Sequence, residues 1–245
     1  MKRRTYLTPN WPAPKNIRAY TSTRLNGFST APFDSFNLGD YVNDDPYCVN
    51  QNKTALIDDL TLPEAPLFLN QVHGDCAVRI EEHTTAPEAD ASFTTKKNKV
   101  CAVLTADCLP VLLCNREGTE VAAIHAGWKG LLVNVIEATI KSMQSSPDDL
   151  IAWMGPGLGP DHFEMGNEVY ADFLNTNPDY ANAFKRDGKR WLFNAYTIGD
   201  LQLKHAGINA IYGGDFCTFK DKERFYSYRR DKGVTGRMTS LIYIT

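Results

Sequence analysis

The stretch VCAVLTADCLPVLLCNREGTEVAAIHAGWKG, residues 100–130, contains three short apolar runs separated by polar turns. Ala-Asp-Cys-Leu separates the first two runs, and the turn-forming residues 115–118 separate the last two. Apolar runs of this length between turn signals are typical of buried β-strands. We therefore predict strands at 100–105, 110–114 and 120–125.

Two chemically reactive side chains lie at the turns of this stretch. Because the chain reverses at each turn, an up-down-up arrangement brings Cys108, in the first turn, to the same sheet edge as His125, at the end of the third strand. Gly127 and Gly130 follow His125, and an apolar pattern of helical period then covers 131–143. A thiol and an imidazole beside a helix N-terminus, whose free N–H groups favour an anion, predict a functional site.

The composition is that of an ordinary soluble globular protein. The chain has 245 residues, 43% hydrophobic and 22% charged, and its length and even composition predict a single domain over 1–245. A net charge of −3 gives no basic excess for nucleic acid or an anionic membrane. The first residues, MKRRTYLTPNWPAPK, lack the apolar run of a signal peptide, so we expect a cytoplasmic protein whose six cysteines are reduced thiols.

Local patterns outside the central stretch predict further elements. We expect helices at 45–59, 167–174 and 195–206, strands at 17–20, 151–154, 210–212 and 241–244, and a strand pair at 67–72 and 76–81 that places His73 at a strand end. The polar stretch 180–190 is expected to be exposed, and the long Gly-, Ser- and Asn-rich loop that follows Tyr20 is of the kind that is often functional.

His73, Cys108 and His125 all occupy tight turns at strand ends, next to Gly or Asp. A thiolate with two imidazoles suits zinc or copper, and three protein ligands leave a coordination position open, as in catalytic metal sites. Asp107 is a candidate to orient a ligand or to act as a general base, and equally a turn-capping residue. A metal-free alternative uses Cys108 as nucleophile with His73 or His125 as its base, and the residues alone do not separate the two.

Several arginines lie in loops rich in Gly or Tyr: Arg24, Arg229, Arg230 and Arg237. Such positions suit the binding of phosphate or carboxylate, or equally a solvated surface.

Several motifs in order give the chain a resemblance that covers nearly its whole length. QVHG at 71–74, ADA at 89–91, TADCLPVLLCN at 105–115, HAGWKG at 125–130, GPGLGP at 155–160 and the ending FYSYRRDKGVTGRM resemble the YfiH family, as does the earlier STRLNGFSTAPFDSFNLG. Members of that family have been called multicopper polyphenol oxidases, laccase-domain proteins, purine nucleoside phosphorylases and a peptidoglycan-editing factor. The chain departs modestly from the family pattern, at Asn26 and Lys129 among other positions.

The resemblance implies an α+β fold, a four-layer α/β/β/α sandwich with mixed sheets. It also implies a zinc ion held by His73, Cys108 and His125, and small-molecule substrates: phosphorolysis of adenosine, inosine and methylthioadenosine, plus deamination of adenosine. For phosphorolysis we nominate Arg24, Ser29, Arg229 and the helix start after His125 as the phosphate-binding groups. We expect a monomer or a weak homodimer.

Two other activities stay open. The first is a copper-dependent polyphenol oxidase, although five histidines without a His-x-His pair are few for a laccase. The second is a cysteine hydrolase that removes L-serine from a UDP-linked muramic acid precursor, UDP-MurNAc-L-Ser.

Overall fold

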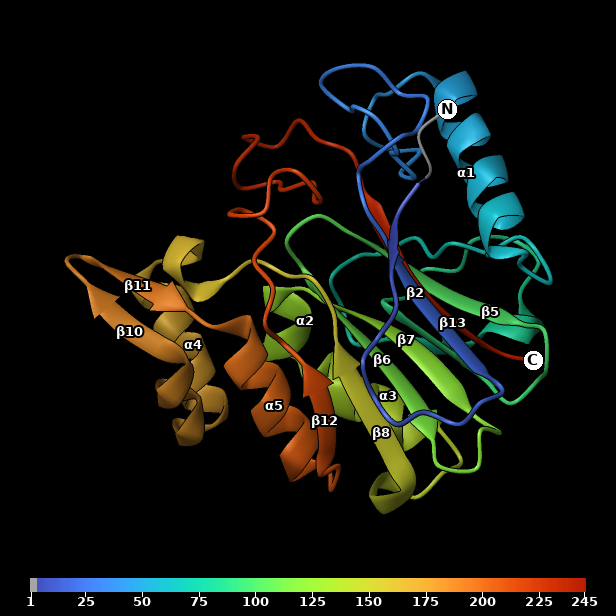
Figure 1. Cartoon of the computed structure of the whole chain (residues 1–245). Helices are drawn as coiled ribbons and strands as arrows, with labels where there is room; N and C mark the ends of the chain where they lie inside the picture. Colours follow the sequence, from blue (N-terminus) through green and yellow to red (C-terminus); the bar gives the residue numbers. More distant parts are fainter. Residues whose placement is uncertain (1–3) are drawn as a thin grey trace.

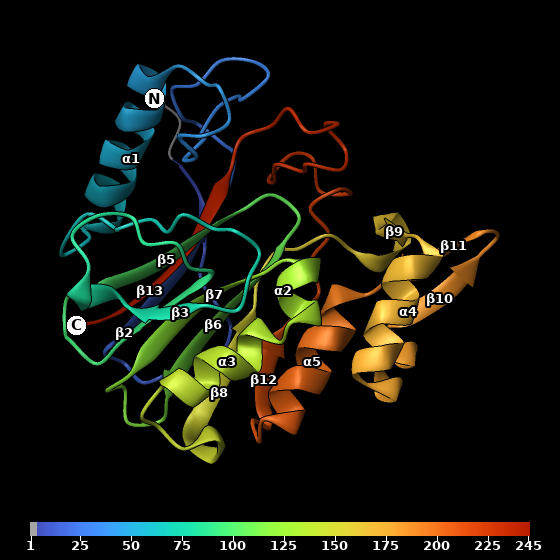
Figure 2. The ribbon, with the colours of Figure 1, turned by 180° about the vertical axis from the view of Figure 1, so that it is seen from behind.

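Two stacked β-sheets form the centre of the computed structural model, which describes residues 4–245 (Figure 1). The four-stranded sheet has the order β1-β2-β13-β5, and the six-stranded sheet has the order β12-β8-β6-β7-β4-β3. Helix α1 covers the outer face of the first sheet, and α3 and α5 cover the outer face of the second (Figure 2). The expected four-layer α/β/β/α arrangement is confirmed.

The strands of the four-stranded sheet are β1 (Tyr6–Leu7), β2 (Ile17–Ser22), β5 (Val100–Thr105) and β13 (Met238–Ile244), all antiparallel to their neighbours. The strands of the six-stranded sheet are β3 (Ala77–Arg79), β4 (Ala91–Thr94), β6 (Leu109–Asn115), β7 (Val121–Ala126), β8 (Leu150–Met154) and β12 (Ala210–Gly213). This sheet is mixed, because the β3–β4 and β8–β12 pairs are parallel. A small antiparallel sheet lies to one side, with β9 (Glu164–Met165), β10 (Phe184–Asp187) and β11 (Arg190–Phe193).

The helices are α1 (Pro46–Leu60), α2 (Trp128–Leu132), α3 (Val135–Ser142), α4 (Asn167–Thr176) and α5 (Ala195–His205). The helices predicted at 45–59, 167–174 and 195–206 are thereby confirmed, as are the strands predicted at 17–20, 151–154, 210–212 and 241–244. None of the helices in residues 4–245 is both long and apolar enough to cross a membrane.

Strand β5 is covered on both faces, by the six-stranded sheet on one side and by α1 on the other. In β5, Cys101 and Val103 pack into the core between the two sheets, whereas Val100, Ala102 and Leu104 pack toward α1. Because successive side chains of a strand point to opposite faces, a strand covered on both faces is apolar at every position. All six residues of β5 are buried, as this arrangement requires.

The predicted meander of three adjacent strands is wrong in one respect. β6 does pair with β7, but β5 pairs with β13 in the other sheet. The turn at Asp107 therefore carries the chain from one sheet to the other, not to a neighbouring strand. Cys108 and His125 still meet, because β5 packs face to face on the six-stranded sheet.

Three local predictions are also corrected. The helix predicted at 131–143 is two helices, because Asn134 adopts a left-handed conformation (φ 67°) between α2 and α3. No strand forms at 67–72 beyond an isolated bridge from Asn70 to Glu88, and β3 pairs with β4 instead. Within 180–190 Tyr180 and Ala183 are buried, and 180–183 belong to a 3₁₀ helix (Pro178–Ala183). The rest, most of it exposed as expected, forms β10 and the turn to β11.

We predict that Leu112→Ala costs about 2–5 kcal/mol of unfolding free energy, because Leu112 is 0% exposed in the core between the sheets and its truncation leaves a cavity there. Denaturant titration followed by circular dichroism measures the change. Val133→Ala is the matched control, since Val133 is 50% exposed. Equal midpoints for the two variants would contradict the layer assignment.

Candidate functional site

His73, Cys108 and His125 converge at one end of the layer between the two sheets. His125 lies near the end of β7, Cys108 lies in the turn from β5 to β6, and His73 lies in the loop before β3. Their ligand atoms all lie within 4.8 Å of one another. The Cys108 Sγ is 3.8 Å from the His73 Nε2, and the two imidazole rings meet edge to face at 4.7 Å between centroids.

Asp90 holds both histidines in place. Its carboxylate is completely buried and accepts a 2.7 Å hydrogen bond from the His125 Nδ1. The same carboxylate accepts the backbone N–H groups of Val72, His73 and Gly74 at 3.2, 3.0 and 2.6 Å. These bonds stabilise the left-handed backbone of His73 (φ 63°), which a non-glycine residue rarely adopts. A carboxylate on Nδ1 also leaves the His125 Nε2 free to act as a ligand or base.

Asp90 lies in the ADA motif at 89–91, and its role is not predicted from the sequence. The sequence does carry a signal, because Asp90 lies between two alanines directly before a strand. A carboxylate in such an apolar setting is expected to be buried, and a buried carboxylate needs several hydrogen-bond donors. Burial by itself would raise the pKa of Asp90, but the hydrogen bonds from His125 and Gly74 lower it below its usual value. Asp90 is therefore ionised at neutral pH.

The thiol of Cys108 and the imidazole of His125 stabilise each other's charged forms. Burial by itself would raise the pKa of Cys108, but His125 and then His73 outweigh it and lower the pKa to about 6. Burial would likewise lower the pKa of His125, but the Cys108 thiolate and Asp90 raise it to about 9. Without a metal, the pair is a thiolate and an imidazolium between these two pH values. The thiolate is the form that acts as nucleophile or metal ligand.

Gly127 allows the three side chains to come together. A Cβ at this position would lie 2.7 Å from the His73 Cδ2 and 3.3 Å from the Cys108 Sγ. Two imidazole nitrogens and one thiolate form a donor set that suits zinc or copper. Within residues 4–245 this is the one group of His, Cys, Asp or Glu side chains arranged to hold a metal ion. The described residues therefore fit a single ion with an open position, and not a cluster of several coppers.

The three side chains line a cavity of about 500 Å³. Four of its other lining residues are aromatic: Tyr41, Trp128, Phe163 and Tyr228. Three more are cationic: Lys129, Arg229 and Arg237. The cavity thus combines flat apolar surfaces with positive charge, next to the candidate metal ligands.

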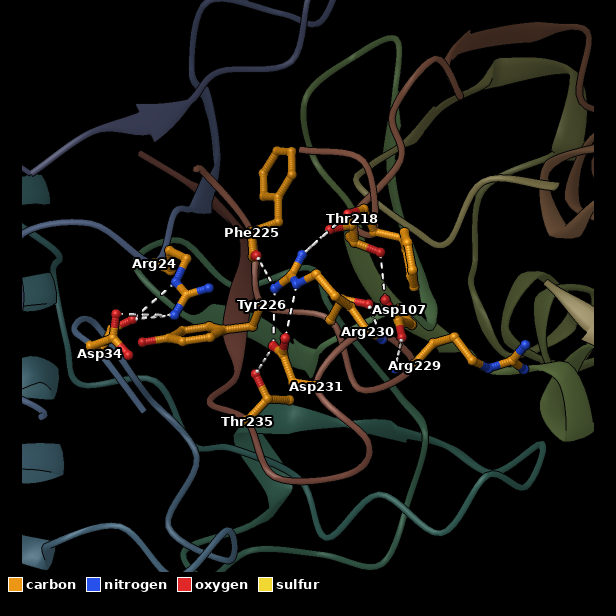
Figure 3. Close-up of polar contacts among 12 residues, drawn as sticks. Arg24, Asp34, Asp107, Thr218, Phe225, Tyr226, Arg229, Arg230, Asp231 and Thr235 are labelled. Carbon is orange, nitrogen blue, oxygen red and sulfur yellow. Dashed lines mark hydrogen bonds and ion pairs between the residues drawn. The ribbon is translucent and has the colours of Figure 1, made fainter. Parts of the chain in front are cut away.

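Asp107 connects the turn that carries Cys108 to the segment 216–237, which joins β12 to β13 (Figure 3). Its carboxylate accepts the Thr218 hydroxyl at 2.5 Å and the Arg229 backbone N–H at 2.6 Å. Burial raises the pKa of Asp107, and these hydrogen bonds only partly oppose the rise. Asp90, and not Asp107, makes the contact to a histidine.

Arg230 holds the segment 216–237 together from inside. Its guanidinium donates to the carbonyl oxygens of Thr218 and Phe225 at 2.8 and 3.0 Å and pairs with Asp231 at 2.8 Å (Figure 3). The Thr235 hydroxyl donates to the same aspartate. The segment has no helix or strand, so these bonds fix the positions of the cavity residues that it carries.

Two of the nominated phosphate-binding residues are not brought to this cavity. The Arg24 guanidinium donates to the Asp34 carbonyl at 2.8 and 2.9 Å and stacks on Tyr226 (Figure 3). Ser29 is buried and accepts a hydrogen bond from the Asn52 side chain. Arg229 does line the cavity. The helix after His125, α2, has only five residues.

Comparison with known proteins places the chain in a family. Residues 18–245 match the model of the family described as multi-copper polyphenol oxidoreductase laccase. The chain belongs to this family. The expected YfiH resemblance is confirmed by a relative from Escherichia coli K12 named purine nucleoside phosphorylase YfiH, which is 44% identical over 239 residues, 97% of this chain and 98% of that protein. A Haemophilus influenzae protein named purine nucleoside phosphorylase is 46% identical over 240 residues, with coverage of 97% and 98%.

Two solved structures have the same fold as this chain. The Neisseria meningitidis protein NMB0706 superposes with a TM-score of 0.93 at 41% identity, covering 98% of both chains. YlmD from Geobacillus stearothermophilus superposes with a TM-score of 0.92 at 26% identity, covering 100% of this chain and 97% of that one.

We predict that iodoacetamide modifies Cys108 of the metal-free protein with a rate that rises with pH and is half-maximal near the pKa of about 6, because only the thiolate reacts. Peptide mapping by mass spectrometry measures the rate. Asp90→Asn is expected to move the midpoint upward, since a neutral amide no longer favours the His125 imidazolium. The same thiol in denaturant is the control, where the midpoint is about 8.5. Equal midpoints in the folded and denatured protein would contradict the assigned charge pair.

We predict that Asp107→Ala lowers the unfolding free energy by about 1–3 kcal/mol, because the buried Thr218 hydroxyl and the Arg229 backbone N–H both lose their acceptor. Asp107→Asn should lower the unfolding free energy much less, since an amide oxygen can accept the Arg229 N–H while the amide NH₂ donates to the Thr218 hydroxyl. Chemical denaturation compares the two variants. An Asn variant as unstable as the Ala variant would show that the charge matters, and not the hydrogen bonds.

Proposed function

We propose that this chain is a zinc-dependent purine nucleoside enzyme, which cleaves adenosine, inosine and methylthioadenosine with phosphate and deaminates adenosine. Relatives that share 44–46% of its sequence are named purine nucleoside phosphorylase, which supports an enzymatic role on small-molecule substrates. The observation that carries the proposal is the group of His73, Cys108 and His125 beside a cavity lined with aromatic and cationic side chains.

The cavity suits the two chemical parts of the proposed reaction. A purine is a flat aromatic ring, which stacks well on side chains such as Tyr228 and Trp128. Phosphate is a doubly charged oxyanion, which needs cationic donors such as those of the same cavity. A volume of about 500 Å³ lies within the usual range of small-molecule sites.

His73, Cys108 and His125 would hold the zinc, and Asp90 would fix the orientation of His125. When bound, zinc supplies a Lewis acid that lowers the pKa of water or polarises a substrate atom. The chain's own residues prepare the site for this chemistry. Asp90 keeps the proton of His125 on Nδ1, so that Nε2 carries the lone pair toward the ligand group. Asp107 places the segment that carries Tyr228 and Arg229 against the cavity.

A polyphenol oxidase is a weaker candidate, although the description of the family names one. Laccase chemistry uses several coppers, and residues 4–245 offer one three-ligand group.

One observation favours a second candidate, the cysteine hydrolase acting on a UDP-linked muramic acid precursor that carries L-serine. Cys108, His125 and Asp90 follow the order of nucleophile, base and orienting acid found in hydrolase triads. A thiolate with a pKa of about 6 would be a ready nucleophile at neutral pH.

We predict one zinc per chain in the purified protein, and turnover of adenosine to adenine and ribose 1-phosphate with phosphate or to inosine without it. Cys108→Ala should lose the metal, and the rates of both reactions should fall at least about 100-fold. The reason is that mutating even a residue that only hydrogen-bonds to a metal ligand typically lowers metal affinity or activity about 10–100-fold. Elemental analysis and chromatography of the products measure both. Cys48→Ala, on the outer helix α1, is the control and should match the wild type.

Each alternative has a distinct result in the same experiment. Copper with oxidation of phenols and no purine products would replace the proposal with the oxidase. A protein without metal whose Cys108 is protected from alkylation by the muramic acid precursor would replace it with the hydrolase.

A further inference from the structure

Three cations of the cavity have no acidic partner. Lys129, Arg229 and Arg237 all line it, and none of them makes an ion pair with the described residues, 4–245. Two arginines in neighbouring positions behave differently, since Arg24 pairs with Asp34 and Arg230 pairs with Asp231. The lack of partners is thus a property of the cations in the cavity, and not of every arginine nearby.

In the described chain the cavity is lined by three cationic side chains and one carboxylate. Asp107 is the one acidic residue among its lining residues in the described chain, and both of its oxygens accept hydrogen bonds from Thr218 and Arg229. Like charges held together in a partly enclosed space repel one another more strongly than in open water. An anionic ligand would remove that repulsion.

Arg237 is the best-placed of the three to bind an oxyanion. Its Nη1 donates to the carbonyl oxygens of Thr235 and Gly236 at 2.9 and 3.1 Å, which fixes the guanidinium plane. No carbonyl oxygen or carboxylate of the described residues accepts a hydrogen bond from its Nε or Nη2, and the Tyr41 hydroxyl lies within hydrogen-bonding reach of the guanidinium. An oxyanion bound by this guanidinium would therefore also meet the Tyr41 hydroxyl. The guanidinium also lies 5.5 Å from the ring centre of Tyr41 and 5.8 Å from that of Tyr228.

Lys129 lies on the side of the cavity formed by the six-stranded sheet, on the helix that follows β7. It lies on α2, four residues after His125, whereas Arg237 directly precedes β13 of the four-stranded sheet. Its ammonium group contacts the Trp128 ring at 5.7 Å and has no hydrogen bond to the described residues. Arg229 is less available, because its two terminal nitrogens donate to the carbonyl oxygens of His162 and Glu164.

We propose that Lys129 and Arg237 form a phosphate-binding subsite beside the His73–Cys108–His125 group, with Arg229 adding positive charge. The subsite takes the place of Arg24 and Ser29, the residues nominated from the sequence. The role of its phosphate as the co-substrate of cleavage rests on the proposed function, but the binding of the anion does not. The same chemistry would recognise inorganic phosphate or the phosphoryl group of a nucleotide.

The first test is binding of inorganic phosphate, measured by calorimetry on the wild type, Arg237→Gln and Lys129→Gln. Each variant should weaken binding about 10–100-fold, because a hydrogen bond to a charged group is worth about 1.5–3 kcal/mol. Arg237→Lys keeps the positive charge but loses the paired N–H donors of the guanidinium. Its affinity for phosphate should therefore lie between those of the wild type and Arg237→Gln. Lys222→Gln is the control, since Lys222 is exposed and lies outside the cavity. Unchanged binding in both Gln variants would overturn the proposal.

The second test separates this subsite from the proposed function. In the Gln variants, KM for phosphate in adenosine cleavage should rise about 10–100-fold. This rise should exceed any change in KM for adenosine in deamination, because deamination uses water and not phosphate. Cleavage with an unchanged KM for phosphate would overturn the subsite and leave the function standing. Phosphate binding that depends on both residues, in a protein that cleaves no nucleoside, would support the subsite and overturn the function.

A competition experiment identifies the source of the anion. Adenosine 5′-monophosphate that displaces phosphate and binds more tightly, with the same dependence on Arg237, would support the subsite and assign it to a nucleotide. Adenosine 5′-monophosphate that binds equally to wild type and Arg237→Gln would overturn the subsite as a nucleotide site and leave inorganic phosphate as its ligand.

Discussion

The buried carboxylate of Asp90 joins three parts of the chain that would otherwise be independent. It lies directly before β4, accepts the imidazole N–H of His125 on β7, and accepts three consecutive N–H groups from the loop of His73. A carboxylate is stable in such a place only because its donors replace the water that burial removes. The same bonds stabilise His73 in a left-handed backbone conformation that a non-glycine residue rarely adopts. Stability and site geometry thus depend on one group, and a neutral replacement would affect both.

The stacking of the two sheets explains where the site lies. His125 follows Val121 and Ala123 on the face of β7 that packs against the four-stranded sheet, because alternate residues of a strand share a face. The layer between the sheets is apolar over most of its length: Leu112, Ile151 and Ile242 fill it. At one end it opens into the cavity lined by His73, Cys108 and His125. Loops from both sheets meet there, so the site is built from segments that are distant in the chain and rigidly held at their bases.

Much of this could be predicted from the sequence, and the failures have identifiable causes. Cys108 and His125 were placed together because both follow apolar runs, and runs of this kind are the strongest local signal in a chain. The partner of β5 could not be inferred, because an all-buried strand carries no pattern that distinguishes one neighbour from another. The role of Asp90 is not visible in the sequence, because it depends on contacts with residues 16–18 and 35 positions away. The surroundings of Arg24 are hidden for a similar reason, since the sequence does not show that its guanidinium pairs with Asp34.

The position of β13 sets the order in which the molecule can be completed during synthesis. This strand comes after all the others in the chain, yet it lies in the interior of its sheet, between β2 and β5. Until β13 has been translated, β2 and β5 each have an open edge, and the pairing that links residue 17 to residue 244 is absent. Such distant contacts form late, because the intervening chain must first be ordered. Arg237 directly precedes β13 and the loop of Tyr41 packs against the same region, so a ribosome-bound chain has the thiol and both imidazoles without a finished cavity around them. The cavity around His73, Cys108 and His125 is therefore complete only after β13 has paired with β2 and β5.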